Sequence, residues 1–194
     1  MHRRGPSGAT GLRSMGGENQ NMIPAWVDGT LTPVEKMQVH KEGLRHKAVS
    51  VFVMNRDKVL IQQRALTKYH TPGLWANTCC THPLWDEVPL DCANRRLAEE
   101  LGIAGLDPVF RDHLEYRADV GNGLTEHEVV DVFVAEANEQ LEMQLNPNEV
   151  MDVRWISVFD LSREVELHPD RFTAWLRIYL KNHADRIFGS LVSS

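Results

Sequence analysis

The order of apolar segments along the chain predicts an α+β fold, or a mixed-sheet α/β fold. Strand-like and helix-like stretches follow one another irregularly and include one hairpin pattern, so a regular βαβ repeat is not indicated. The chain has 194 residues, of which 42% are hydrophobic. That length supports one domain with its own core but not two. We expect this single domain to span residues 22–194.

The predicted strands are short runs rich in β-branched and aromatic residues. Residues 24–29 are expected to form a strand that ends in a turn. Two apolar runs, 49–54 and 59–64, flank the turn-like residues 55–58, a pattern typical of a β-hairpin. Further strands are expected at 111–117, 128–135 and 150–156.

Two helices are predicted from apolar residues at helical spacing. The clearer stripe consists of Leu90, Ala93, Leu97 and Leu101. Gly102 follows where a C-terminal cap belongs, and either Asp86 or Asp91 could cap the start. The second stripe, near the C-terminus, consists of Phe172, Leu176 and Tyr179.

Composition and charge exclude several functional classes. A formal net charge of −6 argues against a nucleic-acid or polybasic membrane surface, and no apolar run approaches the roughly 18 residues that a membrane span needs. Residues 1–21 lack the apolar segment of a secretory signal, and we expect a disordered extension there. Adjacent Cys79 and Cys80 make a poor disulfide pair, so we expect a reduced, cytoplasmic protein.

Two carboxylates stand at the end of the first predicted helix. Glu99 and Glu100 face the negative end of the helix dipole, which costs about 0.3–1 kcal/mol each. Arg95 and Arg96 stand four residues earlier and could offset this cost as ion pairs on a solvated face. A bound divalent cation would remove the penalty as well. Helix physics alone leaves both interpretations open.

The segment 81–103 resembles the Nudix box, G-x5-E-x7-R-E-U-x-E-E-x-G-U, where U is aliphatic. The matching positions are Glu87, Arg95, Leu97, Glu99, Glu100, Gly102 and Ile103. Thr81 replaces the first Gly, and Arg96 replaces the Glu that helps to hold metals in Nudix hydrolases. The resemblance therefore implies a Nudix fold, a mixed β-sheet flanked by helices, but a damaged hydrolase site.

Residues 77–83, Asn-Thr-Cys-Cys-Thr-His-Pro, resemble the segment around the catalytic cysteine of type I isopentenyl-diphosphate isomerases, which have a degenerate Nudix box. The resemblance implies a 1,3-allylic proton shift from isopentenyl to dimethylallyl diphosphate in isoprenoid biosynthesis. Cys80 and Glu128 match the opposed acid and base of that reaction. Tyr116 matches the Tyr beside the Glu, and Trp175 matches the Trp that faces the carbocation.

The same resemblance implies two metal sites and a diphosphate site. The residues that match the His3Glu2 site, which suits Mn²⁺ or Zn²⁺, are His40, His46, His82, Glu126 and Glu128. Glu100 matches the ligand of a Mg²⁺ that bridges diphosphate oxygens. The residues that match the basic diphosphate contacts are Arg64, Lys68, Arg95 and Arg96.

Strand periodicity adds one independent expectation. If residues 126–131 are extended, Glu126 and Glu128 share a face and His127 points away. The same alternation turns Cys79 away from Cys80 and into packing, and Cys92 is expected to pack within its helix. The remaining histidines are expected to be surface or locally bonded residues: His2, His70, His113, His168 and His183.

Three alternatives to an isomerase are compatible with some of these residues. A Nudix pyrophosphohydrolase acting on a nucleoside or prenyl diphosphate would need the metal-activated water that Arg96 undermines. A non-catalytic zinc module using Cys79, Cys80 and His82 lacks paired C-x2-C ligands. A papain-like thiol would need a better-spaced histidine than His82. The expected partner is therefore a small diphosphate substrate, bound by a monomer or a weak homodimer.

Overall fold

The computed structural model describes residues 21–189, so nearly all of the predicted N-terminal extension, and His2 with it, lies outside the described residues. Within this range the strands are β1 (Met22–Val27), β2 (Thr30–Glu35), β3 (Arg45–Asn55), β4 (Lys58–Arg64), β5 (Trp75–Ala76), β6 (Cys79–Thr81), β7 (Val109–Asp119), β8 (Thr125–Glu136) and β9 (Val150–Ser157). The helices are α1 (Lys36–Glu42), α2 (Pro89–Leu101), α3 (Val158–Leu167), the 3₁₀ turn η1 (Pro169–Arg171), α4 (Ala174–Asn182) and α5 (Ala184–Phe188).

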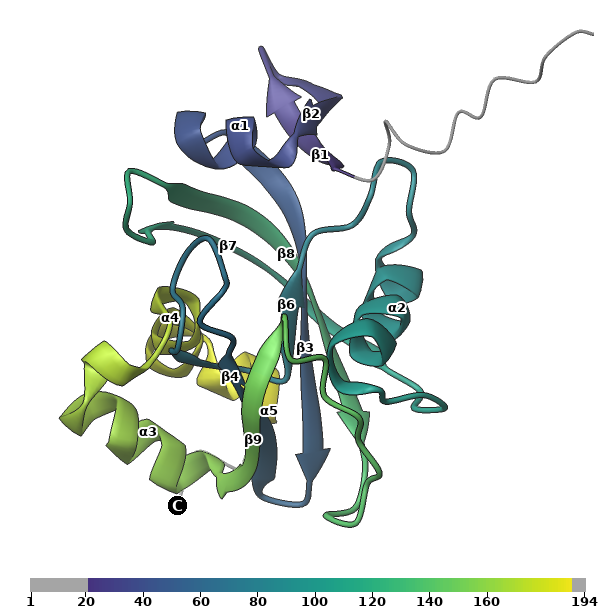
Figure 1. Ribbon diagram of the computed structural model, residues 1–194, viewed down its shortest axis with the longest axis vertical. Helices are drawn as coiled ribbons and strands as arrows, with labels where there is room; N and C mark the ends of the chain where they lie inside the picture. Colours follow the sequence, from purple (N-terminus) through teal and green to yellow (C-terminus); the bar gives the residue numbers. More distant parts are fainter. Residues whose placement is uncertain (1–20, 190–194) are drawn as a thin grey trace, which may run out of the picture.

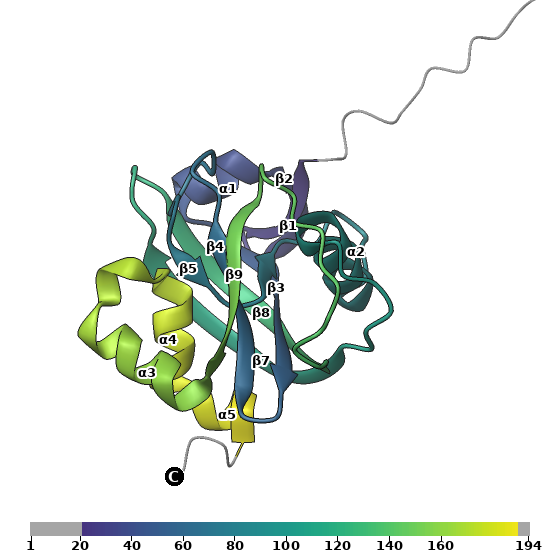
Figure 2. The same cartoon turned by 60° about the horizontal axis from the view of Figure 1, so that its bottom comes forward.

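The strands form one mixed sheet between two helical layers. Helix α2 covers one face, while α3, α4 and α5 cover the other (Figure 1, Figure 2). The central strand β3 is buried on both sides: Val49, Val51 and Val53 pack with α2, whereas Phe52 and Met54 pack on the α4 side. This two-sided burial explains why β3 is a nearly continuous apolar run. The mixed-sheet prediction is confirmed.

The two long strands of the predicted hairpin separate soon after their turn. β3 and β4 pair only at Met54–Val59 and Asn55–Lys58, and each then takes a different partner. β3 pairs in parallel with β8 and antiparallel with β6, and β4 pairs with β5 and β9. Thr78 bridges the opening, because its hydroxyl accepts from Val53 N and donates to Leu60 O. The separation lets β6, which carries Cys80, pair with β3.

The predicted helix at residues 90–101 is confirmed as α2, but its start differs from the expectation. Neither Asp86 nor Asp91 caps it; Val88 is the N-cap residue and Pro89 opens the first turn, where a missing N–H costs nothing. Gly102 ends the helix in the left-handed region, with φ of 67°. A Cβ there would stand 2.7 Å from Gln144 N, so the close approach of residue 144 also requires glycine.

The C-terminal helical region consists of α3, α4 and α5, and Phe172 precedes α4 instead of lying in it. Strand β2 and helix α1 were not predicted. Together with β1 they form a small unit at one end of the sheet (Figure 1), and α1 contacts β8. Among residues 21–189, no helix has the length and apolar character needed to span a bilayer.

Candidate metal centre and active site

Sheet register places the main candidate residues on one face, the face that α4 covers. His46 of β3 is paired with Glu128 of β8, and Glu128 is paired in turn with Tyr116 of β7. On the other side of β3, Ser50 is paired with Cys80 of β6. Paired residues in adjacent strands point the same way, and residues two apart share a face. The thiol of Cys80 and the carboxyl of Glu128 therefore flank β3 from opposite sides, above the same face.

A buried histidine–carboxylate group occupies this face near α1. His40, His46, His82 and Glu126 each offer a ligand atom, and these atoms lie within 4.8 Å of one another. Nε2 of His46 is 3.2 Å from Nε2 of His82, and Nε2 of His40 is 3.1 Å from Glu126 Oε2. These separations match those between neighbouring ligands of one metal ion. The described chain thus brings together four of the five predicted His3Glu2 residues in one group.

The bonding around the group fits a cation. Nδ1 of His40 lies 2.5 Å from Lys36 O and Nδ1 of His46 lies 2.7 Å from Leu44 O, so Nδ1–H donates in each ring and the Nε2 lone pair is free. Nε2 of His40 and Oε2 of Glu126 are buried and have no hydrogen-bond partner among the described residues. Unsatisfied buried ligand atoms aimed at one point are what a divalent metal site requires.

Glu128, the fifth predicted ligand, lies at the edge of this group. Its Oε1 is 3.0 Å from His82 Nε2, while its Oε2 accepts a hydrogen bond of 2.6 Å from the Tyr116 hydroxyl. Burial and the negative charge of Glu126 raise the pKa of the Glu128 carboxyl well above its usual value. Glu128 can therefore reach the metal group with one oxygen while the other is oriented by Tyr116.

His70 corrects the prediction that it is a surface or locally bonded residue. Its side chain is buried, and Nε2 lies 3.2 Å from Glu126 Oε1, although Nδ1 also contacts Thr71. Burial lowers the pKa of His70 to about 4. Burial opposes ionisation of Glu126 too, but the close ring nitrogens of His40 and the neighbouring histidines hold the pKa of Glu126 well below its usual value. No sequence motif singles out His70, which lies in a loop.

His113 and His168 are exposed, as predicted.

The thiol of Cys80 faces the pocket, with a polar pair behind it. Ser50 Oγ donates to Cys80 Sγ at 3.3 Å and lies 2.9 Å from the Tyr179 hydroxyl. Burial raises the pKa of the Cys80 thiol well above its usual value, which keeps its proton on sulfur. Cys79 packs in the core beneath α2, as alternation predicts, and so does Cys92. Trp175 lines the same pocket as Cys80.

Basic side chains form the remaining wall of the pocket. Arg64, Lys68 and Arg96 line it, and so does Lys36, which sequence reasoning missed. Burial and the charge of Lys68 lower the pKa of Lys36 to about 8. Arg95 differs from the other predicted contacts, because it does not line this pocket: Glu87 and Glu99 bind its guanidinium, and it lines an adjoining hollow with Lys68 and Arg96.

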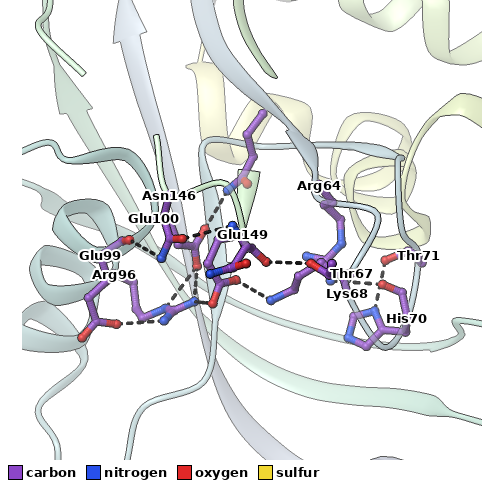
Figure 3. Close-up of polar contacts among 12 residues, drawn as sticks. Arg64, Thr67, Lys68, His70, Thr71, Arg96, Glu99, Glu100, Asn146 and Glu149 are labelled. Carbon is purple, nitrogen blue, oxygen red and sulfur yellow. Dashed lines mark hydrogen bonds and ion pairs between the residues drawn. The ribbon is translucent and has the colours of Figure 1, made fainter. Parts of the chain in front are cut away.

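The predicted ion pairs at the end of α2 are present. Glu99 is exposed and pairs with Arg95 at 3.1 Å. Glu100 is only 5% exposed: its Oε1 accepts from Arg96 Nη2 at 2.6 Å and its Oε2 from Gln62 Nε2 at 2.8 Å. The solvated-face interpretation therefore holds for Glu99 but not for Glu100, which lines the pocket (Figure 3).

A mixed sheet between helical layers is the fold of the Nudix class, and the buried histidine–carboxylate group on one face of this sheet could hold a divalent cation. The family model described as "NUDIX domain" matches residues 44–176. A protein of Deinococcus radiodurans has a similar crystal structure, with a TM-score of 0.68 at 12% identity, covering 86% of this chain and 99% of that chain. A MutT NUDIX hydrolase from Burkholderia pseudomallei gives a TM-score of 0.53 at 25% identity, covering 70% and 95%.

Sequence relatives narrow the class. A protein of Dinoroseobacter shibae named isopentenyl-diphosphate Delta-isomerase is 62% identical, over 90% of this chain and 99% of its own length. A protein of Roseobacter denitrificans with the same name is 68% identical, over 88% and 97%. The chain therefore belongs to the NUDIX domain family and, within it, to the family of these isopentenyl-diphosphate Delta-isomerases.

Proposed function

We propose that the protein converts isopentenyl diphosphate to dimethylallyl diphosphate by protonation of the double bond at one carbon and removal of a proton from another. The observation that carries this proposal is the position of Cys80 and Glu128, which line one pocket from strands on opposite sides of β3. A thiol and a carboxyl placed in this way can approach a small alkene from two sides. The names of the 62–68% identical relatives support the same reaction.

The chain's own residues provide the two proton-transfer groups and a low-water environment. The raised pKa of Cys80 keeps the thiol protonated, so it can act as an acid or, after losing its proton, as a base. The pKa of Glu128 is raised too, and Tyr116 donates a hydrogen bond to this carboxyl, so Glu128 can likewise give up a proton or accept one. The Trp175 side chain is 2% exposed, and its ring could stabilise a carbocation by about 2 kcal/mol. Water must stay out because it would capture the cation.

The buried group at His40, His46, His82 and Glu126 would hold a divalent cation, for which Mn²⁺ or Zn²⁺ is our proposal. When bound, that ion would increase the acidity of a neighbouring carboxyl such as Glu128. His40 and His46 are held in place through their Nδ1–H bonds to the backbone carbonyls of Lys36 and Leu44.

The basic wall is our proposed diphosphate site. Arg64, Lys68 and Arg96 would contact phosphate oxygens, and so would Lys36, which lines the same pocket. Glu100 would hold a Mg²⁺ that bridges the diphosphate. Arg95 lines an adjoining hollow with Lys68 and Arg96, so it would contact the diphosphate less directly.

A Nudix pyrophosphohydrolase is the second candidate, because the fold is shared with a hydrolase. The ion pair between Arg96 and Glu100 disfavours it, since a guanidinium occupies the position of a metal-binding carboxylate of the Nudix box. A metal ion that activates water for hydrolysis would then lack one of its carboxylate ligands.

Product identification tests the proposal. The metal-loaded protein is incubated with isopentenyl diphosphate and Mg²⁺, and both the prenyl product and free phosphate are measured. The isomerase is expected to shift the double bond and to release no phosphate or diphosphate. Release of phosphate or diphosphate without a shifted double bond would identify a hydrolase and overturn the proposal.

A further inference from the structure

A carboxylate that the proposed reaction does not use lies among the basic residues of the pocket. Oε2 of Glu149 accepts a hydrogen bond of 2.5 Å from Lys68 Nζ, and Oε1 lies 3.3 Å from Arg96 Nη2 (Figure 3). The three side chains are each 17–23% exposed, so water screens them only partly. Glu149 is therefore the internal counter-ion of two cations that the diphosphate would need.

The backbone around Glu149 connects the two elements that carry these cations. Asn146 N donates to Glu100 O at 2.9 Å, which fastens the segment to the end of α2. Ala65 N donates to Glu149 O at 2.9 Å, which fastens it to the loop that carries Lys68. Residues 146–149 therefore connect the two elements that carry Lys68 and Arg96, which are far apart in sequence.

The charge of Glu149 also acts on any ligand of this pocket. Its carboxylate repels an approaching anion, and the repulsion grows with the negative charge of that anion. Diphosphate without a metal is more negative than its Mg²⁺ complex. A fixed carboxylate among the cations thus disfavours the metal-free form more strongly than the complex.

We propose that Glu149 is a positioning and specificity-determining residue of the diphosphate site. It holds Lys68 and Arg96 in place and makes the site prefer the Mg²⁺ complex of diphosphate over the metal-free anion. This inference rests on the proposed function, because it takes Lys68 and Arg96 as diphosphate contacts.

Calorimetric titration with inorganic diphosphate, with and without added Mg²⁺, tests the inference. The protein is used as purified, without a chelator, and Mg²⁺ is simply omitted from one of the two titrations. Glu149→Gln removes the charge but keeps an oxygen that can accept from Lys68. We expect it to bind metal-free diphosphate about ten-fold more tightly than the unsubstituted protein does, with a smaller gain for the Mg²⁺ complex. The preference for the complex should fall accordingly.

Two further variants separate charge from structure. Glu149→Asp keeps the charge and should keep the preference. Glu139→Gln is the matched control, because Glu139 forms a similar ion pair with Lys58, at 2.8 Å, among residues that do not line the pocket. With isopentenyl diphosphate, Glu149→Gln should lower KM and leave kcat within about two-fold, whereas a purely structural defect would lower kcat and raise KM.

The outcomes distinguish the two proposals. If the unsubstituted protein binds diphosphate in neither form, the diphosphate site itself is wrong. If it binds the Mg²⁺ complex and Glu149→Gln leaves the preference unchanged, or weakens both forms equally, the role assigned to Glu149 is overturned while the site stands.

Discussion

The two halves of the pocket are built in different ways. In the metal and thiol half, strand register and backbone hydrogen bonds place short side chains, as in the pairings of Cys80 with Ser50 and of Glu128 with His46. In the diphosphate half, long side chains such as Lys68 and Arg96 are held by ion pairs with Glu149 and Glu100. The first half is preorganised by the fold, whereas the second depends on a balance of charges that a ligand can change.

The largest expected effect is in the metal and thiol half of the pocket. Cys80→Ala should lower isomerisation by about 10²–10⁴-fold, because it removes one of the two proton-transfer groups. Turnover by the purified, folded variant is the measurement. Cys80→Ser is the conservative companion and should also be severely impaired, since a hydroxyl holds its proton more firmly. Near-normal turnover in folded Cys80→Ala would reject the role of the thiol.

The metal group can be tested without measuring activity. His82→Ala should reduce the metal content of the purified protein, with affinity lower by more than about 100-fold, because it removes a ligand. His127→Ala is the matched control. His127 stands between Glu126 and Glu128 on β8, but its side chain points to the other face of the sheet, where its Nε2 lies 3.0 Å from Glu115 Oε1. Elemental analysis should find full metal content in the control. Equal retention in both variants would remove His82 from the ligand set.

The two adjacent arginines of α2 should differ in the diphosphate half. Arg96→Ala should raise KM for isopentenyl diphosphate by about ten-fold or more, because Arg96 lines the pocket. Arg95→Ala should change KM by less than about three-fold, since Glu87 and Glu99 bind that guanidinium and it lines only the adjoining hollow. Steady-state kinetics of both variants provides the comparison. A larger KM effect at Arg95 would reverse the assignment.

A smaller effect is expected from pH at Lys36. Burial lowers its pKa to about 8, so the ammonium is charged below pH 8 and loses its proton as the pH rises through that value. Diphosphate affinity should therefore weaken by about three- to ten-fold between pH 7 and pH 9 relative to Lys36→Arg, whose side chain stays charged. Binding is titrated for both proteins with the same ligand, so that the effect of the ligand's own ionisation on affinity is the same in each and drops out of the comparison. Parallel pH profiles would show that Lys36 does not contribute.

Much of the metal and thiol half of the pocket could be predicted from the sequence. Alternation along the strands placed Glu126 and Glu128 on one face and separated Cys79 from Cys80, because the side-chain period of a strand is fixed. The helical stripe and Gly102 located the end of α2 for the same kind of reason. The structure shows both features.

The features that the sequence did not predict depend on contacts between segments that are distant along the chain. Helix α1 has only seven residues, too few for a periodic pattern, and it supplies Lys36 to the pocket. His70 and Glu149 lie in loops without a motif, and their partners are remote in sequence. The early separation of β3 and β4, which admits Thr78 between them, is a tertiary feature that local patterns do not report.

The central claim is that Cys80 and Glu128 act together on one alkene. A double-mutant cycle of Cys80→Ala and Glu128→Gln tests it most directly, with turnover measured at saturating isopentenyl diphosphate in folded, metal-loaded proteins. Because both groups serve one proton shift, the double variant should lose no more than about three-fold beyond the worse single variant. Losses that multiply, or near-normal turnover in Glu128→Gln alone, would contradict the claim.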